Sequence, residues 1–185
     1  EGLVYDMFDR QKHIIDKLPE LSPKGAYVAC DFGTQNATVF LLFQMQSDTG
    51  TWIATREYYY SGREQKRQKT VGEYVADLKR WLNGTKPEKV IVDPSALPLI
   101  TELKQNGLPI QAANNDVLSG ILDVQTMLQT GRLKIYRECK RTIQEFGVYA
   151  WDPDREDVVI KENDHCMDSI RYFVRTKRLV KRAGG

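Results

Sequence analysis

Two spacings of apolar residues alternate along the chain between residues 26 and 131. Short runs rich in β-branched and aromatic residues, bounded by turn-forming residues, are typical of strands, and they occur at 27–31, 38–46, 51–60, 89–93 and 108–112. Longer segments carry apolar residues three or four positions apart, as helices do, and they occur at 71–82, 96–105 and 117–128. The order β-β-β-α-β-α-β-α predicts an α/β fold whose mixed central sheet has three antiparallel strands followed by parallel strands.

The C-terminal third is less regular. We expect one further helix at 137–146 and a final helix at 164–180. Between them, 149–151 and 158–160 would form the arms of an extra hairpin, with its turn at 152–157. The sheet would therefore be flanked by helices, with a hairpin just before the last of them.

The two ends of the chain differ in character from its centre. Residues 1–24 are polar and irregular, which favours an N-terminal arm or linker. The folded domain would then comprise residues 25–180, followed by a basic, flexible tail at 181–185. The chain begins with Glu1 rather than Met, which suggests that it is part of a longer protein.

The composition fits one folded domain. The chain has 185 residues, of which 41% are hydrophobic and 28% charged, enough to bury a core. Its longest apolar runs fall far short of the ~20 residues of a membrane span, so we expect no membrane partner. Cys30, Cys139 and Cys166 are odd in number and far apart, which favours neither a disulfide framework nor a zinc cluster. A soluble protein of reduced cytoplasm fits best.

Acidic and basic residues are segregated near the C-terminus, although the net charge is only +2. Residues 171–185 hold six basic residues and no acidic one, whereas residues 152–168 hold seven acidic residues. Such a pairing suits a metal-dependent enzyme that acts on a polyanion, with phosphates held by the basic cluster and cations by the acidic one. A solvated acidic loop followed by an ordinary basic tail is the alternative.

Two aspartates end predicted strands. Asp31 closes the apolar run 27–30, and Asp93 closes the run 90–92. Since ligands bind at the carboxyl ends of strands in α/β sheets, two such aspartates on neighbouring strands would converge on one site. Each could instead only end its strand or cap the next turn.

The final helix adds a third carboxylate. His165 and Asp168 are three residues apart and share a helix face opposite the apolar arc. Taken alone, His165 could be a surface histidine and Asp168 a solvated acid near a helix N-terminus. Asp164 fits the role of helix N-cap better than that of a ligand.

Three aspartates from separate elements, with a histidine beside one of them, suit Mg²⁺ or Mn²⁺ better than zinc. Two such ions could clamp a phosphodiester, one activating water and the other stabilising the leaving oxygen. Packed carboxylates repel one another until metal arrives, so weak metal affinity is expected. No P-loop motif occurs in these residues, which excludes a P-loop ATPase.

Four motifs in this order resemble the C-terminal nuclease domain of tailed-phage terminase large subunits, notably those of phages of Gram-positive hosts. They are Asp31-Phe32-Gly33-Thr34-Gln35-Asn36, Ile91-Val92-Asp93-Pro94-Ser95-Ala96, Asn114-Asn115-Asp116-Val117 and the segment from Asp164 to Tyr172. The chain departs from the family at two positions that touch no ligand: Ala37 stands where a proline is frequent, and Ser169 where an alanine is frequent.

The resemblance implies an RNase H-like fold and metal-dependent cleavage of double-stranded DNA during genome packaging in the host cell cytoplasm. It implies that Asp31, Asp93 and Asp168 bind the metal ions, and that His165 lies near the second one. It also implies an ATPase motor upstream of Glu1 in the same polypeptide, and a terminase small subunit and a portal protein as partners.

Two other functions remain open at this point. The first motif also resembles the phosphate loop of actin-like ATPases and sugar kinases, although a second Gly-rich loop is missing. A non-catalytic DNA-binding module would use the basic tail together with Arg132, Lys134, Arg137, Lys140 and Arg141 on phosphates. That function leaves the apposed aspartates unexplained.

The predicted hairpin carries an acidic turn just before the Asp168 helix. If the turn hung over the site it would repel DNA, so the segment 149–161 is a candidate gate. An ordinary solvated hairpin is the alternative.

Overall fold

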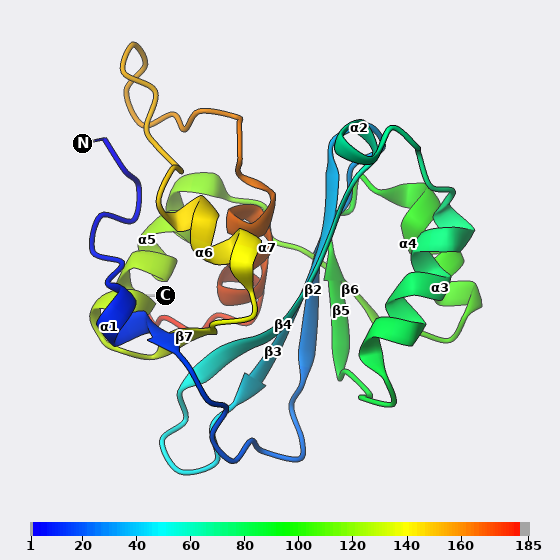
Figure 1. Ribbon diagram of the computed structural model, residues 1–185, viewed down its shortest axis with the longest axis horizontal. Coiled ribbons are helices and arrows are strands. Elements are labelled where there is room, and N and C mark those ends of the chain that lie inside the picture. Colours follow the sequence, from blue (N-terminus) through cyan, green and yellow to red (C-terminus); the bar gives the residue numbers. More distant parts are fainter. Residues whose placement is uncertain (1, 182–185) are drawn as a thin grey trace.

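The computed structural model describes residues 2–181 and shows a twisted mixed sheet with helices packed on both faces (Figure 1). Its strands are β1 (Ile14–Ile15), β2 (Tyr27–Asp31), β3 (Ala37–Met45), β4 (Trp52–Ser61), β5 (Lys89–Val92), β6 (Ile110–Ala112) and β7 (Leu133–Tyr136). They are arranged in the order β1-β7-β4-β3-β2-β5-β6. β2, β3 and β4 pair antiparallel, and all other neighbours pair parallel. The predicted mixed sheet is confirmed.

Helices cover the two faces unequally. One face carries α3 (Val71–Leu82) and α4 (Leu97–Gln105), and the other carries α5 (Val117–Gln129), α6 (Lys140–Phe146) and α7 (His165–Thr176) (Figure 1). Two short helices, α1 (Arg10–His13) and α2 (Gly62–Gln65), lie outside these layers. Because both faces of the sheet are covered, β2 is buried on both sides. Its sequence is therefore a continuous apolar run rather than an alternation of apolar and polar residues. None of the helices within residues 2–181 is long and apolar enough to cross a membrane.

Local sequence explains where the helices begin and end. Thr70 and Glu73 form a reciprocal capping box that starts α3. Asn83, with φ of 48°, closes the same helix in the left-handed conformation that Asn tolerates. Asp116 accepts the backbone N–H of Ser119 and starts α5. These predicted helices therefore lie within one or two residues of their expected bounds.

The expected N-terminal arm is wrong for much of its length. Val4 and Tyr5 are buried in the core, and β1 pairs with β7 at the edge of the sheet. β7 occupies a segment in which the sequence predicts only a connection, and α6 begins at Lys140 rather than at 137. Residues 182–185 of the predicted basic tail lie outside the described residues. The domain boundary near residue 24 stays a prediction.

Candidate functional site

Asp31 and Asp93 lie at the same edge of the sheet. β2 and β5 are parallel neighbours, with Cys30 opposite Val92, so the residues that follow emerge together. α7 packs on one face of the sheet against β2 and β3, contacts α5, and has its first turn beside Asp31. A cavity of about 660 Å³ opens here, and its lining includes Asp31, His165 and Asp168. Three of the four predicted site residues thus share one cavity.

Asp31 and His165 form a direct pair across the cavity. Nδ1 of His165 lies 2.9 Å from Oδ2 of Asp31. Burial raises the pKa of Asp31, against the lowering effect of the His165 hydrogen bond. Burial alone would lower the pKa of His165, but the hydrogen bond and charge of Asp31 raise it. Asp31 therefore favours the protonated imidazole of His165, while its own burial opposes ionisation of the Asp31 carboxyl.

Asp168 is 6% exposed and lies between two cations. Its Oδ1 accepts from the guanidinium of Arg171 at 3.0 Å, and its Oδ2 lies 3.4 Å from Nζ of Lys161. Burial, together with the negative charge of Asp31, nevertheless raises the pKa of Asp168 to about 6. The two carboxylates are therefore close enough to repel each other, which is the condition under which an added cation is attracted.

Asp164 is a residue whose role the sequence did not reveal. It occupies the N-cap position of α7, but its side chain makes no capping hydrogen bond. Its carboxylate is instead buried in the cavity wall, with Oδ2 2.8 Å from Nζ of Lys161. Asp164 is therefore the N-cap residue of α7, as predicted, but its side chain belongs to the cavity rather than to a capping hydrogen bond.

Asp93 is held beside the cavity rather than in its lining. Its Oδ2 accepts from Asn115 Nδ2 at 2.8 Å and from the Tyr172 hydroxyl at 3.2 Å, and its Oδ1 accepts from the backbone of Ser95. Burial would raise the pKa of Asp93, but the hydrogen bonds from Ser95 and Tyr172 lower it. Tyr172 does line the cavity, and the charges of all three predicted aspartates reach its phenol. Tyr172 thus connects Asp93 to the other two.

Glu145 on α6 supplies the cap that Asp164 does not. Its Oε1 accepts the backbone N–H groups of Cys166 at 2.8 Å and Met167 at 3.2 Å, at the start of α7. Burial raises the pKa of Glu145 to about 7 despite these two hydrogen bonds. This contact fixes the end of α7 that carries His165 and Asp168. Glu145 lies 21 and 22 positions before the two residues whose N–H groups it accepts, a separation that no local capping pattern covers.

We expect Glu145 and Asp168 to make the metal-free chain less stable as the pH rises from about 4 to about 7. The carboxyls of Glu145 and Asp168 bind a proton more tightly in the folded chain than in the unfolded one, so the free energy of unfolding falls across this range. Glu145→Gln keeps a neutral acceptor for α7 and should remove part of that fall. Urea unfolding over a pH series, with the exposed Glu138→Gln as control, checks this. An identical pH profile for Glu145→Gln and the unchanged chain would contradict it.

Arg171 of α7 does not face solvent. Arg171, placed in the basic cluster by the sequence, is 2% exposed and bonds to Asn115 as well as Asp168. A side chain at Gly120 on α5 would overlap Arg171, so the glycine makes room for it. Arg171 is therefore part of the site's support and is not free to bind phosphate, contrary to expectation.

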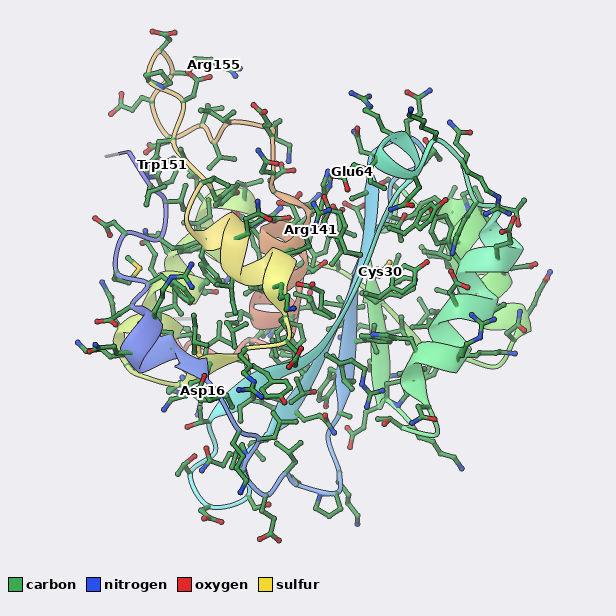
Figure 2. All side chains as sticks on the ribbon, viewed as in Figure 1. Asp16, Cys30, Glu64, Arg141, Trp151 and Arg155 are labelled. Atoms are coloured by element: carbon green, nitrogen blue, oxygen red, sulfur yellow. The ribbon has the colours of Figure 1, made fainter. Side chains whose placement is uncertain are left out.

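The hairpin forms only in part. Trp151 and Val159 make a single antiparallel bridge, and the acidic turn lies at the end of a loop that projects away from the sheet. Figure 2 shows Arg155, in the turn, far from Cys30, which precedes Asp31. It is the segment after the hairpin, 161–164, that lines the cavity. This geometry favours the solvated-hairpin alternative over a gate formed by the acidic turn.

The donor chemistry of the cavity suits a hard divalent cation, because its ligands are carboxylate oxygens with one imidazole. Among residues 2–181, however, no three His, Cys, Asp or Glu side chains are already arranged as metal ligands. Lys161 and Arg171 balance the carboxylates instead. The residues present therefore fit a cation that displaces Lys161.

Comparison with known proteins finds relatives along almost the whole chain. No protein-family model matches it. The large terminase of the thermophilic bacteriophage D6E, in complex with ADP, matches 97% of this chain with a TM-score of 0.91 and 40% sequence identity. The chain is homologous to terminase large subunits. The large subunit of Escherichia phage T5 is also 23% identical over 94% of the chain.

Two solved nuclease domains of large terminases share the fold of this chain. The P22 large terminase nuclease domain matches with a TM-score of 0.76 and 21% identity, covering 96% of this chain and 93% of that domain. The nuclease domain of the SPP1 large terminase, with bound Mn, matches with a TM-score of 0.69 and 15% identity. The match covers 95% of this chain and 99% of that domain. The fold is therefore the RNase H-like fold of these nuclease domains, as expected.

The homologue spans less than half of its longer relatives. It covers 46% of the D6E chain and 42% of the T5 subunit. The narrower expectation of a phage with a Gram-positive host stays a prediction.

Proposed function

We propose that the chain is a metal-dependent endonuclease domain that cuts double-stranded DNA, the concatemeric viral genome, during packaging. The observation that carries the proposal is the convergence of Asp31, Asp168 and His165 on one cavity in a large-terminase homologue. The SPP1 nuclease domain was solved with bound Mn, which supports divalent metal use.

In this proposal Asp31 and Asp168 in the cavity, together with Asp93 beside it, would hold two Mg²⁺ or Mn²⁺ ions, with His165 near them. Bound divalent cations would neutralise the phosphodiester and make water a better nucleophile. His165 has a second task available. Its Nδ1 is engaged by Asp31, whereas its Nε2 makes no hydrogen bond within residues 2–181, so Nε2 can orient a water or exchange a proton with it.

The wider assembly is also part of the proposal. We place the ATPase motor in the same polypeptide, and the terminase small subunit and portal protein as partners, in the host cell cytoplasm. The nearly balanced charge of +2 gives the isolated chain little general attraction for DNA, so the assembly would supply much of the affinity.

The actin-like alternative needs backbone N–H groups free to cradle phosphate after Asp31. The N–H of Gly33 instead donates to Oγ1 of Thr38, which returns a hydrogen bond to the Gly33 carbonyl. A Cβ at Gly33 would lie 2.7 Å from the carbonyl oxygen of Ala37, so the loop is closed on itself. These contacts favour a structural turn here over a nucleotide loop.

The test is incubation of supercoiled plasmid with the chain in Mn²⁺, Mg²⁺, Ca²⁺ or EDTA. We expect cleavage with Mn²⁺ or Mg²⁺ and none with EDTA. Binding of ATP without cleavage would support the actin-like alternative, and a metal-independent shift of the DNA without cleavage would support a binding module. Either outcome would contradict the nuclease.

Replacing Lys161 by Met should tighten Mn²⁺ binding by about tenfold. The Lys161 ammonium pairs with both Asp164 and Asp168, so an incoming cation must displace it. A tenfold change in affinity corresponds to about 1.4 kcal/mol of binding free energy. Isothermal titration with Mn²⁺ measures this, with the distant Lys86→Met as the matched control. Equal affinities for the two variants would mean that Lys161 does not compete with metal.

A further inference from the structure

A basic turn stands next to the catalytic cavity and takes no part in the network that joins its carboxylates. α2 follows β4 at the end of the sheet where β3 begins, with Ser61 paired to Ala37 (Figure 1). The segment 62–69 carries four basic residues and one acidic residue. We name residues 62–67 the α2 turn.

The α2 turn is fixed firmly on the loop that follows Asp31. The backbone N–H of Arg63 donates to the Gln35 carbonyl. Within the turn, the backbone N–H of Arg67 donates to the Gly62 carbonyl at 3.0 Å. A Cβ at Gly62 would lie 3.3 Å from the carbonyl oxygen of Arg67, so glycine permits this close approach. Glu64 is held from the other side by Arg141 of α6, with two N–O contacts of 3.2 and 2.7 Å (Figure 2).

Two cations of this rigid turn are left without an acidic partner. Arg67 pairs with Glu73, whereas Arg63 and Lys66 are exposed and form no ion pair with any residue of 2–181. Lys66 adopts φ of 55°, which Lys rarely does, and so is held in an uncommon backbone conformation. Such a position persists only when its surroundings fix it.

Arg63 connects two hollows of the surface. It lines the cavity that contains Asp31 and Asp168, and it also lines a second hollow of about 240 Å³ together with Lys66 and Gln35. The other lysine or arginine of the main cavity, Lys161, is already paired with Asp164 and Asp168. Arg63 is therefore the cation of that lining which is available to an anion.

We propose that Arg63 and Lys66 bind backbone phosphates of the DNA next to the phosphodiester that is cut. These contacts would set the path of the DNA into the cavity. The inference rests on the proposed nuclease function and adds the surface that positions its substrate. Two unpartnered cations on a rigid turn next to a carboxylate cavity match the charge of a phosphodiester chain. Contacts of this kind carry no base preference.

The test measures binding of a fluorescent DNA duplex in Ca²⁺ over a series of salt concentrations. The variant is Arg63→Gln with Lys66→Asn, since Asn tolerates the left-handed conformation at 66. The slope of log affinity against log salt should become shallower by about 2, roughly one unit for each phosphate that the variant no longer binds. Arg63→Lys with Lys66→Arg keeps both charges and should keep most of the slope, and circular dichroism confirms folding.

The matched control is Lys86→Gln with Lys89→Gln, two exposed lysines at the opposite, amino-terminal end of β5. It should leave the slope unchanged, and every variant should still bind Mn²⁺. A chain that cuts DNA but keeps its full slope after the Arg63 and Lys66 changes would overturn this inference alone. An unchanged chain that neither binds nor cuts DNA would overturn the proposed function as well.

Discussion

Asp31→Asn is expected to reduce DNA cleavage to the level of the EDTA control while the chain stays folded. Asn removes one of the negative charges of the cavity but keeps an oxygen for the His165 hydrogen bond. Because burial raises the pKa of Asp31, the charged carboxylate is costly in the metal-free chain, and the neutral amide should be at least as stable. Initial rates on supercoiled plasmid in Mn²⁺, together with urea unfolding, measure both effects.

The matched control for this change is Asp116→Asn. Asp116 caps α5 near the site, and Asn caps helices about as well as Asp, so cleavage and stability should both be retained. Cleavage that persists in Asp31→Asn at the rate of the control would remove Asp31 from the catalytic site.

Arg171→Met is expected to cost about 3–5 kcal/mol of folding stability, because it leaves the buried Asp168 without the cation that it contacts most closely. The effect should be larger than that of Arg175→Met, since Arg175 is about one quarter exposed where it contacts Asp123. Urea unfolding at neutral pH measures the two changes side by side.

A double-mutant cycle with Asp168→Asn separates charge pairing from packing. If the pair is the cause, Arg171→Met should cost much less in the Asp168→Asn background than alone. Additive costs would mean that Arg171 stabilises the chain only by filling the space beside Gly120.

The parts of the fold that the sequence predicted are those with a strong local pattern. β2 and β5 are apolar runs long enough to stand out, and α3 and α5 carry both a periodic apolar stripe and a capping residue. β1 was missed because it has only two residues, and β7 because Lys134 interrupts its apolar residues. The pairing of β1 with β7 also joins segments that are about 120 residues apart. Edge pairing of that kind depends on the tertiary fold rather than on local propensity.

The residues of the site also divide into those that a local sequence pattern reveals and those that only the tertiary structure reveals. Asp31 and Asp93 were identifiable because each ends an apolar strand, and the topology then brings the strand ends together. The expectation for Arg171 failed because a polar residue on a helix commonly faces solvent, whereas α7 is covered by the sheet on one side and by α5 and α6 on the other. Arg171 lies three residues after Asp168, and this spacing is the signal that could have shown the buried pair. Gly120, in the middle of α5, makes room for the Arg171 side chain.

Glu145 and Lys161 could not have been assigned from the sequence. Glu145 acts at the start of α7 only because α6 packs there, and Lys161 reaches two carboxylates only because its loop lines the cavity. Neither residue lies in a motif, and both contacts arise from tertiary packing.

Anomalous X-ray diffraction from crystals of the chain soaked in Mn²⁺ would show directly whether the carboxylates at the ends of β2 and α7 form a divalent metal site. We predict an anomalous peak within coordination distance of Asp31 and Asp168, with the Lys161 ammonium moved away from Asp168. Under conditions in which Mn²⁺ supports cleavage, a cavity without manganese and with the Lys161–Asp168 pair intact would contradict a metal site at these carboxylates.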